Sequence, residues 1–580
     1  MTNDYLIKKV FNSFLFVSIM AMVAATIGML VDGIVIGQFL GQECVSSFGL
    51  ASPVFILIAA VAGIFSNGGT SCCSNHIGRG EEEKIKVNFT VTCLASLIVG
   101  IVVMLICVMG STQIAIFLGA RDELIRHTSD YIRGIGLGGV FIILSQVVMY
   151  YVRTDNDSVL GFISVLFMTA CNITLDIVFA TVLKLGMFGM GLATSISYLV
   201  CLLVCMAHFL RKDNNLKFAK MSGGMQEFKD VFLTGIPSAL NRACMTVRGI
   251  YLNRLLMALM GSIAVSALSV QNNVNQFLSS VTMGVGMTVM LMAGIFYGER
   301  DESALSRTLK VSLKMGVLLS TIVSVLVIIF ARPIVGMFLS SSEEALALAV
   351  RSLRMFCLSL PFSLSCVVLL NFYQCTKNLF MANFICIAHG LVFVVLYSMI
   401  LSPVIGTDGV WISFLLSEIT TLVLLVVVIR FRAKKVPKSF ADMMMISENF
   451  EPDKERMLNI SIKNDMDQVM QLSSRIEDFC RQYSEDENKI EKLSLCIEEM
   501  AGNIVQHGFK DKKQHFIDIK IIMAEKEIIF RMRDDGIAFN PLQFEAADDT
   551  DKFGIAVVRK MAKEIEYKNA IGMNNLTIVL

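Results

Sequence analysis

Long apolar runs separated by short polar connectors fill the first three quarters of the chain. A membrane-spanning helix needs about 20 predominantly apolar residues, and about twelve runs meet this criterion before residue 436. Their centres lie near Met20, Ile58, Val99, Leu144, Phe167, Val200, Ile250, Val281, Ser324, Val367, Val394 and Leu422. The pattern predicts a polytopic α-helical membrane protein.

The apolar region repeats itself at an offset of about 220 residues. Three pairs of polar segments correspond at this offset: Gly78–Glu82 with Gly298–Glu302, Arg153–Asn156 with Gln374–Lys377, and Gly186–Gly189 with Gly406–Gly409. We therefore expect two six-helix halves, residues 1–220 and 221–436. In transporters built from such repeats, the substrate path runs between the halves.

Basic residues are distributed unevenly between the connectors. One set of connectors carries most of the Lys and Arg residues, for example Arg79, Lys84, Lys86, Arg153 and Lys377. Cytoplasmic loops carry the excess of positive charge, so this set is predicted to be cytoplasmic. With an even number of spans, both termini of this multi-pass protein are expected on the cytoplasmic side of a bacterial plasma membrane.

Composition narrows the function classes. The chain has 580 residues, of which 55% are hydrophobic and 17% charged, with a formal net charge of +1. This balance is typical of a membrane protein, and the absence of a basic excess argues against nucleic acid as a partner. The 15 cysteines lack zinc-type spacing and are interpreted as packing residues.

Ionisable residues inside apolar runs are candidate functional groups, because burying them in lipid is costly. Asp32 ends the first run, and Asn172 and Asp176 lie in the fifth. Their i, i+4 spacing puts Asn172 and Asp176 on one helix face. Carboxylate and amide oxygens there can hold Na⁺ or accept a proton. The alternative for both aspartates is a purely structural hydrogen bond.

The second half carries different polar residues. Position 396, which the repeat pairs with Asp176, is a leucine, whereas Arg248, His389 and Glu418 lie in other apolar runs. Arg248 needs a counter-charge or water, and Glu418 is one candidate. These three residues are interpreted as part of a substrate path. A satisfied buried histidine is the alternative for His389.

These features resemble the multidrug and toxic compound extrusion (MATE) transporters over roughly residues 5–435. The resemblance rests on Asp32–Gly37, Asn172-x-x-x-Asp176, Gly189–Thr194 and Gly235-Ile-Pro237. It implies export of a small organic compound by alternating access, driven by Na⁺ or H⁺. Asp32, Asn172, Asp176 and Thr194 match the cation-site pattern of the first half. The second-half acid is missing and extra arginines are present, which suits an anionic or zwitterionic cargo.

Beyond a linker at residues 437–456, the chain reads as a soluble domain at residues 457–580. Periodicity predicts strands at 458–462, 517–522, 528–532 and 575–580, and helices at 467–483, 489–507 and 553–565. A hairpin is expected at Glu525–Glu527. Helices that cover an antiparallel sheet give a two-layer α+β sandwich.

Three motifs in this domain point to a nucleotide. Glu499 and Asn503 share a helix face, where an amide oxygen can ligate Mg²⁺ and a carboxylate can act as a general base. Asp534 and Gly536 follow a strand and can receive an adenine. Gly554 and Ala556 open a helix whose N-terminus can receive phosphates. Each motif alone is also compatible with an ordinary polar surface.

Together, the motifs resemble the GHKL (Bergerat) ATP-binding fold, closest to its anti-sigma-factor serine kinases. The resemblance covers Cys496–Gly508, Arg533–Pro541, Phe553–Arg559 and Gly572–Thr577. It implies ATP and Mg²⁺ as cofactors, with Glu499 as catalytic base and the acidic segment Glu545–Asp551 in the ATP lid. Ala556 stands where the family normally has a glycine, which puts fast turnover in doubt. A histidine phosphoacceptor helix is not evident.

Two functions therefore compete. The first is a cation-coupled transporter regulated by a cytoplasmic ATP-binding domain. The second is a membrane-anchored serine/threonine kinase that acts on a cytoplasmic protein partner and uses the transporter fold as a sensor. Direct ATP-driven pumping is disfavoured because the sequence has no Walker A motif.

Overall fold

The computed structural model describes residues 3–211, 214–338, 343–433, 439–446, 450, 456–484, 486–511, 513–524, 527–543 and 553–580. The chain forms two compact units. Unit 1 consists of Met1–Ser13, Arg300–Arg307 and Ile446–Leu580, and unit 2 of Phe14–Glu299 and Thr308–Met445. Much of the expected linker, part of the expected hairpin and the acidic segment Glu545–Asp551 lie outside the described residues.

Unit 2 is helical. The helices of its first half are α1 (Tyr5–Val35), η1 (Ile36–Leu40), α2 (Gln42–Arg79), α3 (Glu82–Met109), α4 (Ser111–Phe117), α5 (Glu123–Leu137), α6 (Gly139–Thr154), α7 (Ser158–Ile177), η2 (Val178–Val182), α8 (Gly186–Cys205) and η3 (Met206–Leu210). The second half contains α9 (Gly224–Met260), α10 (Ser262–Gly298), α11 (Glu302–Ile329), α12 (Ala331–Gly336), α13 (Glu343–Cys357), α14 (Leu360–Cys375), α15 (Leu379–Ile387), η4 (Ala388–Val392), α16 (Phe393–Ile405) and α17 (Thr407–Ala433). The short helix α18 (Phe440–Met443) follows.

The helices confirm a polytopic membrane protein. Among the described residues, 9 helices are long and apolar enough to cross a membrane, or up to 11 if each of two bent helix pairs forms one span. The span expected near Ile250 corresponds to α9. This helix has 37 residues but falls short of the apolar criterion, because Arg242, Arg248 and Arg254 interrupt it.

The backbone shows the internal repeat directly. The bent pair α5–α6 turns by 47° and the bent pair α13–α14 by 46°. Positive φ angles also recur about 220 residues apart: φ is 89° at Gly41 and 65° at Gly261, and 60° at both Asn156 and Lys377. The two halves therefore share a chain path although their polar residues differ.

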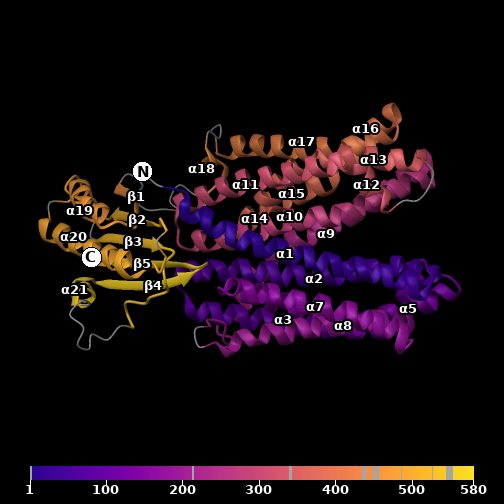
Figure 1. Cartoon of the computed structure of the whole chain (residues 1–580), viewed down its shortest axis with the longest axis horizontal. Helices are drawn as coiled ribbons and strands as arrows, with labels where there is room; N and C mark the ends of the chain where they lie inside the picture. Colours follow the sequence, from indigo (N-terminus) through magenta and orange to yellow (C-terminus); the bar gives the residue numbers. More distant parts are fainter. Residues whose placement is uncertain are drawn as a thin grey trace. The chain divides into compact units, whose positions relative to one another are not determined.

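The two halves of unit 2 lie side by side. Figure 1 shows α2, α3, α5, α7 and α8 in one group and α9 to α17 in the other. Helix α2 packs against both α9 and α10, and α3 also contacts α9. The interface between the halves is thus built largely by α2 and α9.

Unit 1 contains an antiparallel five-stranded sheet in the order β1-β2-β3-β5-β4. The strands are β1 (Met457–Lys463), β2 (Phe516–Met523), β3 (Ile528–Asp534), β4 (Glu564–Ala570) and β5 (Met573–Val579). In the register, Asp518 lies opposite Arg533, and Lys520 lies opposite Arg531. The sheet confirms the α+β class expected for this domain.

Three helices accompany the sheet (Figure 1): α19 (Met466–Cys480), α20 (Glu487–His507) and α21 (Phe553–Met561). The apolar core between the layers includes Leu472, Ile497, Ile519, Phe530 and Ile578, all buried. The expected helix at 553–565 was too long, because Glu564 and Ile565 begin β4, a strand that the sequence analysis did not predict.

Candidate functional site

The polar residues of the first half meet inside the helix bundle. Asp32 on α1 and Asp176 on α7 are buried and lie within hydrogen-bonding reach of each other. The Asn172 amide donates to Asp176 Oδ2 at 3.3 Å. The Oδ1 atoms of both aspartates have no hydrogen-bond partner among the described residues. Carboxylates this close repel each other when both are ionised, and a cation between them relieves that repulsion.

Thr194 of α8 is also buried, and its hydroxyl donates to the Met190 carbonyl at 3.2 Å. Within the described residues, no cluster of three His, Cys, Asp or Glu side chains is arranged to hold a metal ion. Asp32, Asn172 and Asp176 therefore offer two carboxylates and an amide oxygen, whereas the Thr194 hydroxyl bonds within its own helix. This chemistry suits one proton or one monovalent cation.

The second half contains a different charged pair. His389, in the π-helical segment η4, faces Glu418 of α17, with 3.2 Å between Nδ1 and Oε1. Both residues are buried. Arg248 of α9 is within electrostatic range of Glu418, but its guanidinium lies over the Phe414 ring, 5.3 Å from the ring centre. The fold thus brings together all three residues that the sequence analysis singled out in this half.

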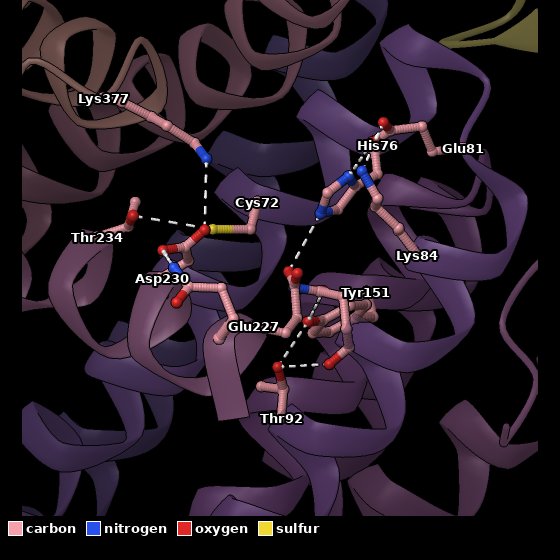
Figure 2. Close-up of polar contacts among 12 residues, drawn as sticks. Cys72, His76, Glu81, Lys84, Thr92, Tyr151, Glu227, Asp230, Thr234 and Lys377 are labelled. Carbon is pink, nitrogen blue, oxygen red and sulfur yellow. Dashed lines mark hydrogen bonds and ion pairs between the residues drawn. The ribbon is translucent and has the colours of Figure 1, made fainter. Parts of the chain in front are cut away.

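A polar network joins the two halves at one end of the helices (Figure 2). His76, at the end of α2, lies between two glutamates: its Nδ1 is 2.6 Å from Glu81 Oε2, and its Nε2 is 3.1 Å from Glu227 Oε1. Glu81 also accepts a hydrogen bond from Lys84. Since Glu227 belongs to α9, His76 connects the first half to the second.

The network continues from Glu227 into the first half. The Asn88 amide donates to Glu227 Oε1 at 2.7 Å, and Tyr151 OH bonds to Asn88 at 2.5 Å and to Thr92 at 2.9 Å. The Glu227 carboxyl group thus contacts His76 of α2 and Asn88 of α3. Glu227 therefore links α2, α3 and α9.

A second contact between α2 and α9 lies nearby in Figure 2. Cys72 Sγ is 3.8 Å from the Thr234 hydroxyl, and Lys377 Nζ is 3.9 Å from Asp230 Oδ2. Cys72 is buried, so its thiol is kept away from solvent.

The nucleotide motifs converge in unit 1. Helix α20, which carries Glu499 and Asn503, packs against both β3 and α21. A Cβ atom at Gly554 would lie only 1.7 Å from Glu499 Oε2, so any other residue at 554 would collide with this carboxylate. Ala556 is half-buried in the first turn of α21. Glu499 and the helix N-terminus expected to receive phosphates therefore adjoin.

Asp534 ends β3 and is buried. Its Oδ1 accepts hydrogen bonds from Gly536 N at 2.8 Å and from Asn574 Nδ2 at 2.9 Å. Burial raises the pKa of Asp534 to about 6, although both hydrogen bonds oppose the shift. A Cβ atom at Gly536 would lie 2.5 Å from the Gly508 carbonyl oxygen. Asp534 is thus held in one orientation by two hydrogen bonds.

Unit 1 also includes Arg300–Arg307, which comprises the end of the connector after α10 and the first turns of α11. Asp301 in this segment is 1% exposed and faces cations on β2 and β3. Its oxygens lie 3.2 Å from Lys520 Nζ, 2.7 Å from Arg533 Nη1 and 3.8 Å from Arg531 Nη1. Burial would raise the pKa of Asp301, but these three cations hold it well below its usual range.

Comparison with known proteins shows which family this chain belongs to. Residues 18–178 and 237–400 match the MatE family, and residues 462–580 match the histidine kinase-like ATPase domain. The chain belongs to the MatE family. Both resemblances inferred from the sequence are thereby confirmed.

Curated relatives of this MatE-family chain are named multidrug export protein MepA. The MepA of Staphylococcus saprophyticus is 25% identical over 419 residues, which cover 71% of this chain and 91% of that protein. The MepA of Staphylococcus haemolyticus is 26% identical over 421 residues, with the same coverage. The matches span most of each relative, whereas a sizeable part of this chain lies outside them.

Solved structures show the same fold. One is the outward-facing conformation of a multidrug resistance MATE family transporter of the MOP superfamily, with a TM-score of 0.70 and 21% sequence identity. The match covers 74% of this chain and 96% of that transporter's chain. A MOP superfamily transporter from Pyrococcus furiosus Vc1 has a TM-score of 0.69 and 22% identity, and covers 74% and 97%. The MatE fold of the helical region is therefore established.

Several polar residues of this MatE-family chain escaped the sequence analysis. His76 and Glu227 lie 151 positions apart, and Asp301 and Lys520 lie 219 apart, so spacing carries no signal for either contact. Arg153 was counted among the connector charges, but it lies in the last turn of α6 and is 6% exposed. Only its position next to a long apolar run indicated that Arg153 could be buried.

Proposed function

We propose that the protein exports small organic compounds in exchange for a cation that binds at Asp32 and Asp176. The observation that carries this proposal is the buried contact between these two carboxyl groups. A buried carboxyl pair is costly to keep in lipid, and such groups mark ion and proton pathways in membrane proteins. The name of the curated relatives, multidrug export protein, supports an organic cargo.

We further propose a proton as the coupling ion. Direct contact between two carboxyl groups requires that one of them be protonated, and Asn172 donates to Asp176 in the same arrangement. Uptake of a second proton, or loss of the shared one, changes the charge of this group by one unit. Na⁺ bound to the same oxygens, with Thr194, is the alternative that the experiment below distinguishes.

The buried pair His389–Glu418 and the neighbouring Arg248 support a cargo path in the second half. These residues are far less apolar than their helical surroundings, and ionisable groups in such positions line cavities or pathways. We propose that they contact polar groups of the cargo. The first half would then bind the coupling ion and the second half would bind the exported compound.

For unit 1, we propose that it binds Mg²⁺-ATP on the cytoplasmic side and regulates transport. Asn503 would ligate Mg²⁺, Asp534 would receive the adenine, and Gly554 and Ala556 would adjoin the phosphates. The cytoplasmic orientation is supported by basic connectors such as those containing Arg79 and Lys377. Regulation is supported by Asp301, which lies between α10 and α11 but forms ion pairs with β2 and β3.

A serine/threonine kinase activity is the second candidate. It is favoured by Glu499, which adjoins Gly554 and so lies near the proposed phosphate position. Incubation of the full-length protein with labelled ATP and a cell extract tests it. A labelled protein that disappears with Glu499→Gln would support the kinase, whereas no transfer would leave ATP as a regulator.

Transport is tested with purified protein in sealed proteoliposomes that contain a fluorescent organic cation. We expect efflux to accelerate when protons are allowed to enter in exchange, and to be unaffected by a Na⁺ gradient alone. Acceleration by Na⁺ alone would replace the proton by Na⁺ as the coupling ion. The absence of stimulation by either gradient would contradict cation-coupled export.

A further inference from the structure

A small cavity in unit 2 is lined by residues from both halves. It lies between α1, α2, the end of α6, the start of α7 and α10, and offers about 40 Å³ to water-sized groups. Its polar lining includes Thr70, Tyr150, Arg153 and Ser158, and its apolar lining includes Met287 and Leu291. This cavity is separate from the carboxyl pair at Asp32 and Asp176.

Arg153 is the cationic residue in this lining. Its side chain is 6% exposed, and its Nε and Nη2 atoms have no hydrogen-bond partner among the described residues. Nη1 lies 3.8 Å from the Met287 sulfur. A thioether sulfur is only a weak hydrogen-bond acceptor. The Ser158 hydroxyl, which lines the same cavity, also lacks a partner in the described part of the chain. Unsatisfied buried donors of this kind are costly.

The nearest acidic residues in the sequence do not neutralise Arg153. Asp155 accepts hydrogen bonds from Asn215 and lies 2.8 Å from His208 Nε2. Asp157 pairs with His208 at 3.0 Å and with Arg211 at 3.0 Å. Both carboxylates are thus engaged elsewhere, and the positive charge of Arg153 faces a cavity lined by hydroxyl groups.

Close packing fixes the position of the guanidinium. The Arg153 side chain crosses Gly161 of α7, where an added Cβ atom would lie 2.7 Å from Arg153 Cγ and 2.9 Å from its Nε. The absence of a side chain at Gly161 therefore makes room for Arg153. An arginine held in place in this way loses little further freedom when it binds an anion.

We propose that this cavity is an anion subsite, in which Arg153 and Ser158 bind the carboxylate or phosphate group of a ligand with an apolar body. A guanidinium binds such groups through charge-assisted, often bidentate hydrogen bonds. The cavity is large enough for an anionic head group but not for a whole drug-sized molecule. Met287 and Leu291 offer contacts to the adjoining apolar part of the ligand.

The subsite deepens the proposed export function, on which this step rests, because it adds anionic amphiphiles to the cargo. Its ligand can come from two sources, a soluble organic anion or the head group of an anionic phospholipid. Both share the chemistry of an anion attached to an apolar body, so the experiment must separate them.

Binding is measured with the full-length protein in nanodiscs of zwitterionic phosphatidylcholine, by ¹⁹F NMR with 4-fluorobenzoate. We expect Arg153→Gln to weaken binding at least about tenfold, the factor that corresponds to one charge-assisted hydrogen bond. Arg153→Lys should retain part of the affinity. The neutral isostere 4-fluorobenzamide should bind wild type and Arg153→Gln equally weakly. An unchanged thermal unfolding transition of all variants checks that they are folded.

The second part of the experiment uses nanodiscs that contain the anionic lipid phosphatidylglycerol. If this lipid competes with 4-fluorobenzoate in wild type, the anionic lipid is a ligand of the subsite; if it does not, the soluble anion is the ligand. Binding of 4-fluorobenzoate that is identical in wild type and Arg153→Gln, together with no competition by the lipid, would overturn the proposal. Because no transport is measured, this result would leave cation-coupled export untouched.

Discussion

Asp301 and Arg533 form a buried ion pair in which Asp301 Oδ2 lies 2.7 Å from Arg533 Nη1. Arg531 and Lys520 lie opposite each other on β3 and β2, and like charges in such positions repel. The Asp301 carboxylate is within 3.8 Å of both and offsets this repulsion. A residue from the segment between α10 and α11 is therefore part of the folded ATP-binding unit.

Asp301→Asn should destabilise unit 1 by about 3 kcal/mol or more, because it removes a buried carboxylate that pairs with three cations. Native-state proteolysis of the full-length protein in increasing urea measures this change. Glu564→Gln, at an exposed site on β4, is the matched control and should change stability by no more than about 0.5 kcal/mol. Equal proteolysis of Asp301→Asn and wild type would contradict the role of the pair.

The same pair predicts a pH dependence. Because the folded-state pKa of Asp301 is lowered, its contribution is fully present above the unfolded pKa of about 3.9. It is lost only as pH falls through the still lower folded value. The stability difference between wild type and Asp301→Asn should thus be constant from about pH 5 to 8. A difference that already shrinks between pH 7 and 5 would rule out this assignment.

Asp176→Asn should abolish proton-driven efflux from proteoliposomes and leave ATP binding unchanged, because the amide cannot take up or release the shared proton. The matched control is Thr174→Val, on the exposed side of the same helix, whose hydroxyl bonds only to the Ala170 carbonyl among the described residues. The control should transport at the wild-type rate. Proton-driven efflux by Asp176→Asn at the wild-type rate would contradict the coupling site.

ATP affinity should fall on acidification. The adenine amino group needs a hydrogen-bond acceptor, which the ionised Asp534 carboxylate would provide. Burial raises the pKa of Asp534 to about 6, so acidification protonates this carboxylate. We expect affinity to be constant above about pH 7 and to drop up to tenfold per pH unit below about pH 6. Calorimetric titration of the full-length protein with Mg²⁺-ATP measures this. Asp534→Asn should bind weakly at every pH and show no step.

Breaking the polar network at Glu227 should loosen the contact between α2 and α9. In a variant in which Cys72 is the sole cysteine, Glu227→Gln should increase the rate of Cys72 alkylation about tenfold, which corresponds to the loss of about 1.4 kcal/mol of closing free energy. Glu83→Gln is the control, because Glu83 pairs only with Lys86 among the described residues and is 80% exposed. Unchanged alkylation in Glu227→Gln would show that the network does not hold the halves together.

Local patterns predicted most of the fold. All twelve centres of the apolar runs lie in helices, because burial in lipid demands long apolar segments whatever the tertiary contacts are. Strand β4 was missed, since Glu564–Ala570 forms an edge strand with little buried apolar surface. The alternation of polar and apolar residues in Glu564–Lys568 is short and closely follows α21, so the expected helix at 553–565 was extended into it.

The candidate sites were predictable where one helix carries several of their residues. Asn172 and Asp176 are four positions apart on α7, and Glu499 and Asn503 on α20, so helical spacing alone revealed them. Contacts such as His76 with Glu227, or Asp301 with Arg533, depend on how helices and strands from distant parts of the chain pack. Only the tertiary structure provides this information.

Unit 1 is assembled from separate segments of the chain, and this affects how the ATP-binding domain can be isolated or fused to another protein. A fragment that begins at Met457 would carry Lys520, Arg531 and Arg533 without Asp301, and would lack the N-terminal residues that belong to the same unit. The C-terminal segment alone therefore lacks the carboxylate that pairs with these three cations. In a fusion with another carrier, an acidic residue between the corresponding helices would balance the cations in the same way.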